Sequence, residues 1–154
     1  ETSKDGFKIL NQDIKVFAER DPANLPWGKV GLSICYDLRF PYHYRALAQA
    51  GATMLTVPAA FTYVTGKAHW HTLLKARAIE NGAYVFAPAQ VGDHTNGRKT
   101  YGHSLVVDPW GEVVCDGGED VGVSVVDIDL DKVVDVRNRI ASLTHDRKVV
   151  IREL

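Results

Sequence analysis

The hydrophobic pattern of the chain alternates between short apolar runs and segments with apolar residues at helical spacing. Residues 30–35, 52–57 and 83–87 are apolar runs of the length of one buried strand. Between them, residues 42–50 and 66–82 place apolar side chains three and four positions apart, as in helices that bury one face. This order of strand, helix and strand predicts an α/β fold with a parallel strand pair joined by a right-handed crossover.

The second half of the chain shows weaker signals. Residues 104–108 and 112–115 flank a Pro-Trp-Gly turn and are predicted to form a hairpin. Residues 92–102 are rich in glycine and polar side chains, which predicts an exposed loop. The alternation in 122–129 predicts a further strand. Asp131 is placed to cap a last helix that runs toward Arg139.

The first 29 residues show little regular pattern. Only 7–10 and 13–17 alternate as short strands do, and the pair Asp21-Pro22 marks a turn after them. We therefore expect a strand or a hairpin that leads into the strand at 30–35.

Composition limits the class of protein. A chain of 154 residues with 45% hydrophobic content is able to bury one core, which predicts one domain or a large part of one. The net charge of −1 gives no electrostatic footprint for nucleic acid or an anionic membrane. Two cysteines outside any C-x-x-C pair argue against a disulfide scaffold and a zinc site. With no leader or apolar span in the sequence, we expect a cytoplasmic protein.

Cys35 lies where an apolar strand is predicted to end and a helix to begin. A strand-to-turn-to-helix junction is a favourable place for a nucleophile, since the helix N-terminus stabilises negative charge. A buried structural cysteine is the alternative, because free cysteine is often buried. The polar neighbours Tyr36, Asp37 and Arg39 favour the nucleophile. Arg39 forms either an ion pair with Asp37 or a contact with a polar substrate.

Three separated motifs carry a resemblance to a known family. They are GLSICYDLRFP at residues 31–41, VPAAFTYVTGKAHWHTLLKARAIENGAYVFAPAQVG at 57–92, and YGHSLVVDPWGEVV at 101–114. Together they resemble the nitrilase superfamily of carbon–nitrogen hydrolases, in the amidase branch that includes the deaminated glutathione amidases. Three long motifs in the same order make coincidence a poor explanation.

The resemblance implies a chemistry for Cys35. Similar proteins hydrolyse an amide through a cysteine thioester and release ammonia, with a glutamate base, a lysine and no metal or organic cofactor. By this resemblance, Cys35 is the nucleophile and the backbone N–H of Tyr36 helps to hold the oxyanion. The implied partners are a small amide substrate and a second copy of the chain in a homodimer, with no nucleic acid and no membrane.

The sequence departs from the family before the cysteine. The family's catalytic glutamate and lysine lie in a region that this sequence does not contain, and no lysine before Cys35 has the family's surrounding motif. Glu1 is matched to an auxiliary glutamate of the family. We therefore interpret residues 1–154 as a partial carbon–nitrogen hydrolase domain, the C-terminal portion of the family's α-β-β-α sandwich, and expect little or no activity from the chain alone.

The substrate surface is assigned around Cys35 and after the second predicted strand. It comprises Asp37, Arg39, Phe40, Ala60, Phe61 and Thr62. Phe61 and Thr62 follow a buried strand at the edge where open α/β sheets bind ligands, although core packing explains them equally well.

Several polar residues have structural interpretations. Arg77 and Glu80 have ion-pair spacing on one helix. His69 and His71 point apart on a helix, so no metal pair is expected. His71 also stands where many relatives have an acid.

Three alternatives to the amidase assignment remain open. One is a catalytic pair of Cys35 with His103. The second is a truncated relative without catalysis. The third is another branch activity, that of an ω-amidase or an N-carbamoyl amidohydrolase.

Overall fold

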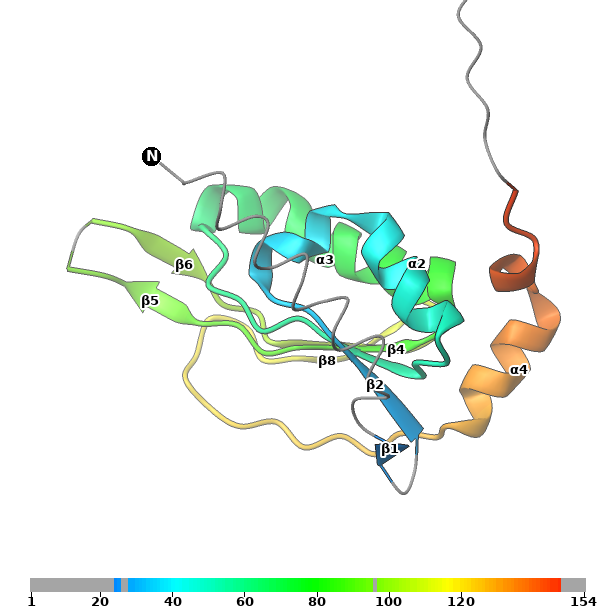
Figure 1. Ribbon diagram of the computed structural model, residues 1–154. Coiled ribbons are helices and arrows are strands. Elements are labelled where there is room, and N and C mark those ends of the chain that lie inside the picture. Colours follow the sequence, from blue (N-terminus) through cyan, green and yellow to red (C-terminus); the bar gives the residue numbers. More distant parts are fainter. Residues whose placement is uncertain (1–23, 26–27, 96, 148–154) are drawn as a thin grey trace, which may run out of the picture.

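A computed structural model describes residues 24–25, 28–95 and 97–147. Its main sheet has the strand order β1-β2-β3-β4-β7-β8 (Figure 1). These strands are β1 (Asn24–Leu25), β2 (Gly28–Leu32), β3 (Met54–Thr56), β4 (Tyr84–Ala87), β7 (Leu105–Val107) and β8 (Val113–Asp116). Glu1 and the strands predicted at 7–10 and 13–17 lie outside the described residues.

The centre of the sheet is parallel and its far side is antiparallel. β2 pairs with β3 and β3 with β4 in parallel, as the strand–helix–strand order predicts. β4 pairs with β7, and β7 with β8, in antiparallel register. The predicted hairpin is therefore confirmed, and the fold is a mixed α/β sheet flanked by helices.

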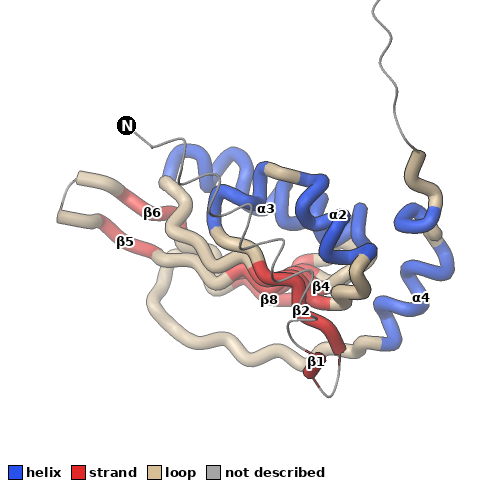
Figure 2. The backbone as a smooth tube through the Cα atoms, in the orientation of Figure 1, coloured by secondary structure: helices blue, strands red, loops and turns tan. Residues whose placement is uncertain are grey.

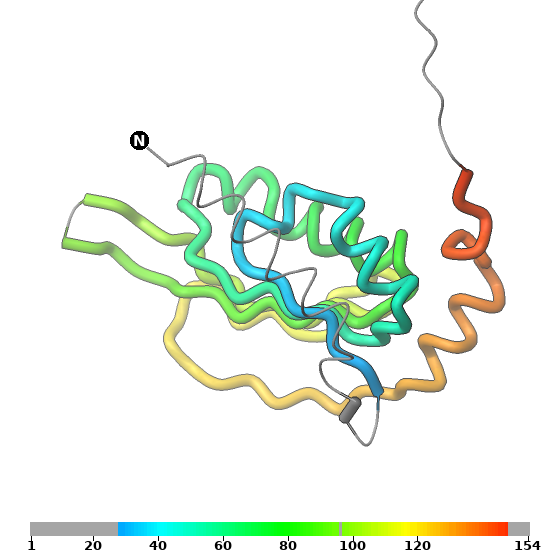
Figure 3. The backbone as a smooth tube through the Cα atoms, in the orientation of Figure 1, coloured from blue at the N-terminus to red at the C-terminus, as the bar shows by residue number. Residues whose placement is uncertain are grey.

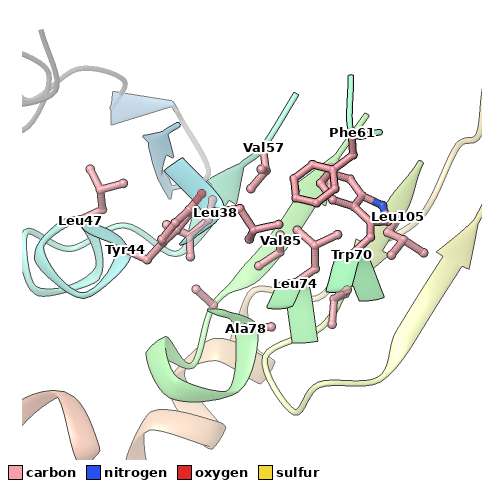
Figure 4. Close-up of a cluster of buried hydrophobic side chains, with 14 of the residues drawn as sticks. Leu38, Tyr44, Leu47, Val57, Phe61, Trp70, Leu74, Ala78, Val85 and Leu105 are labelled. Carbon is pink, nitrogen blue, oxygen red and sulfur yellow. The ribbon is translucent and has the colours of Figure 1, made fainter. Parts of the chain in front are cut away.

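Two helices cover one face of this sheet (Figures 1 and 2). They are α2 (Pro41–Gln49) and α3 (Tyr63–Asn81), and α3 ends where Gly82 takes a left-handed φ of 52°. Leu55 and Val85 project from the strands toward these helices and are fully buried. Both belong to the main core cluster with Trp70 and Leu74 of α3. Figure 4 shows Val85 in this cluster with those two side chains.

The opposite face of the sheet is covered only in part. Met54 and Tyr84 alternate with the core residues of their strands and pack against Val133 of α4 (Asp131–Arg139). The segment 117–130 begins with a turn at residues 118–119 and then runs along this side of the sheet before it enters α4 (Figure 3). A cavity of about 430 Å³ separates residues 120–124 from β4, β7 and β8.

The exposed loop predicted at 92–102 is confirmed at residues 94–95 and 97–98 and is wrong for the two short strands on either side of them. Residues Val91–Asp93 (β5) and Lys99–Tyr101 (β6) form a two-stranded antiparallel sheet that projects from the main body (Figure 1). Thr100 and Tyr101 are buried. The polar composition hides this hairpin, because it is stabilised where Tyr101 packs against the start of α3 rather than by an apolar strand pattern.

The strand predicted at 122–129 is also wrong. Its residues take no strand pairing, and Val121, Val123 and Val125 are more than 90% exposed. Alternating valines favour a strand, but a strand also needs a neighbour with free backbone groups. The described part of the chain brings none beside this segment.

Two smaller expectations also fail. The strand that leads to Cys35 ends at Leu32, since the backbone then turns into the 3-10 helix η1 (Cys35–Arg39). Asp131 is the first residue of α4, which follows Leu130, and not its cap. The carboxylate of Asp129 instead accepts the Asp131 N–H at 2.9 Å.

Candidate active site

Cys35 occupies a strained turn at the carboxyl end of β2. Its φ is 46°, a left-handed value that residues with a side chain rarely adopt. The Cys35 N–H donates to the Pro58 carbonyl at 2.9 Å, which ties the turn to the chain leaving β3. Backbone strain of this kind concentrates at functional sites. Cys35 is partly exposed and packs against the main core cluster, while its backbone is held in place.

Asp37 holds this turn together from within. Its carboxylate accepts the Ile34 N–H at 2.9 Å, and its own N–H donates to the Ile34 carbonyl at 3.0 Å. Asp37 is 6% exposed and forms no ion pair with Arg39 among the described residues. Of the two sequence interpretations of Arg39, the ion pair with Asp37 is therefore wrong.

Arg77 supports the same turn from α3. Its Nη2 and Nε donate to the Leu38 carbonyl at 2.7 and 3.1 Å, and its Nη1 pairs with Glu80 at 2.9 Å. The predicted Arg77–Glu80 ion pair is confirmed. The contact with Leu38 was not predictable, because it joins residues 39 positions apart.

A second anchor lies under β2. The Ser33 hydroxyl lies 2.6 Å from the Tyr44 hydroxyl and donates to the Thr56 carbonyl at 2.8 Å. Burial raises the pKa of Tyr44 well above its ordinary value, so this hydroxyl stays neutral. The strand end, α2 and β3 are thus joined directly behind the cysteine.

Aromatic and cationic side chains surround the turn. The Arg39 guanidinium lies 5.2 Å from the ring centre of Phe61 and 5.7 Å from that of Tyr36. Phe40 makes an edge contact with Tyr36 at 5.7 Å between ring centres. Phe61 is 5% exposed and packs on Trp70. Phe61 therefore belongs mainly to the core, with Arg39 lying over its ring.

Ala60 and Thr62 lie on the same edge, beside residues of the projecting hairpin. The Ala60 carbonyl accepts from Arg98 Nη2 at 2.7 Å. The Thr62 hydroxyl lies 2.6 Å from that of Thr65, and Thr62 bridges to Thr100. The structure therefore brings the predicted residues of η1 and of segment 58–62 to one edge of the sheet.

His103 lies apart from Cys35. It precedes β7, and β7 is separated from β2 by three strand spacings, or roughly 14 Å at about 4.8 Å each. Its Nδ1 lies 2.9 Å from Asp116, and no hydrogen bond of the described residues joins it to Cys35. This placement argues against a Cys35–His103 pair.

A polar cluster that the sequence did not predict includes His103. His71 Nε2 lies 3.0 Å from Asp116 Oδ2, and His103 Nδ1 lies 3.1 Å from the same oxygen. Burial acts to raise the pKa of Asp116, but hydrogen bonds from His71, the Gly118 N–H and His103 outweigh it and hold that pKa below its ordinary value. The low expectation of a metal site rested on His69 and His71, whereas the structure pairs His71 with different partners.

Sequence similarity identifies the family to which the chain belongs. The family model for carbon–nitrogen hydrolases matches residues 10–138, so the chain belongs to the carbon–nitrogen hydrolase family. Within it, the chain is similar to deaminated glutathione amidases: 53% identical over 119 residues to that of Synechocystis and 51% over 126 residues to that of Homo sapiens. These matches cover 77% and 82% of this chain but 44% and 38% of the two relatives.

Solved structures show the same fold. The Caenorhabditis elegans NitFhit protein aligns with a TM-score of 0.78 at 50% identity, covering 80% of this chain and 30% of that one. An amidase of Nesterenkonia, in a form with acrylamide added to its active-site cysteine, aligns with a TM-score of 0.63 at 32% identity, covering 77% of this chain and 46% of the amidase. This chain therefore spans less than half the length of the relatives it matches.

Among the described residues, no helix combines the length and the apolar character needed to cross a bilayer.

Proposed function

We propose that the protein containing this chain is an amidase that hydrolyses small amides bearing a carboxylate, with Cys35 as nucleophile. The observation that carries the proposal is the φ of 46° at Cys35, a strained and partly exposed thiol at the carboxyl end of β2. Membership of the carbon–nitrogen hydrolase family and the amidase relatives support it. Activities of an ω-amidase or N-carbamoyl amidohydrolase type use the same nucleophile and are distinguished by substrate.

The proposed reaction has two steps. Cys35 Sγ attacks the amide carbonyl carbon, and a C–S bond forms while the carbonyl oxygen becomes an oxyanion. The Tyr36 N–H, in the first turn of η1 and thus without an acceptor inside that helix, donates to the oxyanion. The C–N bond then breaks as the nitrogen takes up the proton that the Cys35 thiol lost on attack, and the nitrogen leaves as ammonia. Water attacks the resulting thioester, releases the acid and restores the thiol.

Arg39 is the proposed anchor for the substrate carboxylate. Its guanidinium lies against the rings of Phe61 and Tyr36 and is not paired with an acidic side chain among the described residues. A planar guanidinium held between aromatic rings binds a carboxylate through two parallel hydrogen bonds. Asp37, Phe40, Ala60 and Thr62 complete the proposed surface around it.

The residues needed to activate Cys35 are proposed to come from outside this sequence. Family resemblance assigns the base to a glutamate and the second oxyanion donor to a lysine, both placed before the cysteine, with Glu1 as an auxiliary glutamate. The valines at 121, 123 and 125 are more than 90% exposed, which supports an incomplete domain. We therefore propose that residues 1–154 alone have little or no amidase activity.

A second candidate is a folded relative without catalysis. One experiment separates the two. The intact mass of the protein from its native source fixes the chain length, and hydrolysis of small ω-amide acids is then measured in that chain and in its Cys35→Ala and Cys115→Ala variants. We expect turnover that Cys35→Ala abolishes and Cys115→Ala leaves intact. No turnover in the native protein would favour the second candidate, and turnover by 1–154 lost in Cys35→Ala would contradict its proposed inactivity.

A further inference from the structure

Three metal-ligating side chains from three separate elements converge at one place on the surface. His71 comes from α3, His103 from the link between β6 and β7, and Asp116 from the end of β8. One ligand atom of each residue lies within 4.8 Å of the corresponding atoms of the other two. All three side chains retain access to solvent, with exposed fractions of 33%, 20% and 35%.

We propose that His71, His103 and Asp116 bind a divalent first-row transition metal ion, with Zn²⁺ as its representative. Two imidazole nitrogens and one carboxylate oxygen form a ligand set of borderline softness. Mg²⁺ and Ca²⁺ prefer sites made of oxygen alone, and Cu⁺ prefers sulfur, so these ions fit the cluster less well. Three protein ligands leave the fourth tetrahedral position to water from the exposed side.

The spacing of the ligand atoms fits such an ion. His71 Nε2 lies 3.0 Å from Asp116 Oδ2, and His103 Nδ1 lies 2.9 Å from Asp116 Oδ1. Bonds of about 2.0–2.1 Å to a tetrahedral zinc place neighbouring ligand atoms roughly 3.3 Å apart. His71 Nε2 and His103 Nδ1 both lie beside Asp116 Oδ2, and the three ligand atoms are within 4.8 Å of one another, so rotation of these side chains brings them toward a common ion.

The surrounding structure fixes the ligands in position. The Trp70 indole N–H donates to the His103 carbonyl at 2.8 Å, and the His103 N–H donates to the Gly118 carbonyl at 2.7 Å. Tyr101 stacks on the His103 imidazole at 4.3 Å between ring centres. The Gly118 N–H donates to Asp116 Oδ1 at 2.9 Å. The Gly118 hydrogen bond to the ligating carboxylate is an outer contact of the kind whose loss typically costs about 10–100-fold in metal affinity, while the other contacts hold His103 in place.

Metal binding changes the hydrogen bonding of the cluster. A carboxylate only accepts hydrogen bonds, so in the metal-free cluster both imidazoles donate their facing N–H to Asp116. A metal ion needs the lone pairs of those same nitrogens, and each ring proton then occupies the nitrogen that faces away. The ion thus joins α3, β8 and the β6–β7 link through bonds that replace two hydrogen bonds.

The test is Zn²⁺ titration of the 154-residue chain by calorimetry, with Co²⁺ absorption in the visible range as a spectroscopic measurement. The titration is repeated in a chain that carries both Cys35→Ser and Cys115→Ser, so that no thiol competes as a ligand. His69→Gln is the matched control, because His69 lies on the same helix two residues before His71 and outside the cluster. Asp116→Asn keeps the side-chain oxygen that accepts the Gly118 N–H, and circular dichroism verifies the fold of each variant.

We expect one Zn²⁺ per chain, a higher melting temperature with Zn²⁺, and a tetrahedral Co²⁺ spectrum. His71→Gln and Asp116→Asn are expected to weaken Zn²⁺ binding at least about 10-fold, since a lost ligand costs no less than a lost outer contact. His69→Gln is expected to change nothing. Absence of Zn²⁺ binding, or binding that folded His71→Gln and Asp116→Asn retain, would overturn the proposal and leave the cluster as a hydrogen-bond network.

Discussion

The guanidinium of Arg77 donates two hydrogen bonds to the main-chain carbonyl of Leu38, at 2.7 and 3.1 Å. Arg77 is 5% exposed on α3, and Leu38 is fully buried in η1. The ring of Tyr44 lies 5.5 Å from the same guanidinium. One side chain of the second helix therefore sets the position of the turn that presents Cys35.

The first prediction follows from this contact. Arg77→Met removes both donors and leaves the Leu38 carbonyl buried without them, which is expected to lower the free energy of unfolding by about 1.5–3 kcal/mol. The denaturant midpoint measures this loss. Arg139→Met is the control, because its i,i+4 pair with Asp135 is exposed and contributes little. Equal stability of the two variants would contradict the anchoring role of Arg77.

The second prediction concerns Asp108, which is 2% exposed in the β7–β8 turn. It accepts the N–H groups of Trp110 and Glu112 and the ammonium of Lys132 on α4. Burial acts to raise the pKa of Asp108, but these donors outweigh it and hold the pKa below its ordinary value. The hydrogen bond to Asp108 raises the pKa of Lys132.

The sign of the pH effect follows from these directions. A lowered carboxyl pKa stabilises the fold above the unfolded value near 4, and this stability is lost as pH falls through the folded pKa. The pKa of Lys132 is raised in the folded state. Its contribution to stability is therefore complete below the pKa of the unfolded state and is lost as the pH rises through the pKa of the folded state. Asp108→Asn is expected to cost about 1–3 kcal/mol at pH 7 and to flatten the acid limb of stability against pH. Asp135→Asn, which affects an exposed ion pair, is the control and is expected to change neither the stability at pH 7 nor the acid limb. An unaltered acid limb in Asp108→Asn would show that Asp108 does not have the lowered pKa.

The third prediction tests the packing of α2 on β2. A methyl group at Gly31 would lie 2.9 Å from Leu55 Cδ2 and 3.1 Å from Leu47 Cβ. Gly31→Ala is therefore expected to destabilise the fold by about 1–3 kcal/mol through overpacking. Gly122→Ala is the matched control, because no atom lies within 4 Å of its added methyl group. The melting temperatures of both variants measure this effect. An unchanged melting temperature in Gly31→Ala would show that α2 shifts to accommodate the methyl group at no cost in stability.

The fourth prediction rests on the proposed function and concerns Arg39. In a preparation that hydrolyses amides, Arg39→Ala is expected to raise KM for carboxylate-bearing amides by about 10–100-fold, the loss of a charge-assisted pair. KM for neutral amides should change little. Arg139→Ala serves as the exposed control. An equal rise in KM for both substrate kinds would assign Arg39 to the shape of the turn instead of to the carboxylate.

The elements that the sequence predicts correctly are those with a clear local pattern of hydrophobic and turn residues. The parallel strands, α2, α3 and the β7–β8 hairpin come from apolar runs and turn residues that act over short distances. The β5–β6 hairpin is missed because Thr100 and Tyr101 are buried by partners far along the chain, and local polarity gives no sign of that. The valines at 121, 123 and 125 show the opposite failure, a strand pattern without a strand beside it.

The site is predicted in part for the same reason. The residues of η1 and segment 58–62 share a sheet edge because parallel strands end together, and that rule is local. Arg77 supports a carbonyl 39 positions away in the chain. In the histidine cluster, His71 lies 32 positions from His103 and 45 positions from Asp116. The strained φ of Cys35 has one sequence signal, its place between a strand and a helix.

The most direct test of the central claim is the rate of thiol alkylation at Cys35 compared with Cys115, mapped by mass spectrometry in the amide-hydrolysing preparation. Both thiols are free and partly exposed, so Cys115 corrects for simple access. We predict that Cys35 is alkylated faster and that a small ω-amide acid protects it selectively. Equal rates at the two cysteines, with no protection of Cys35, would contradict its assignment as the nucleophile.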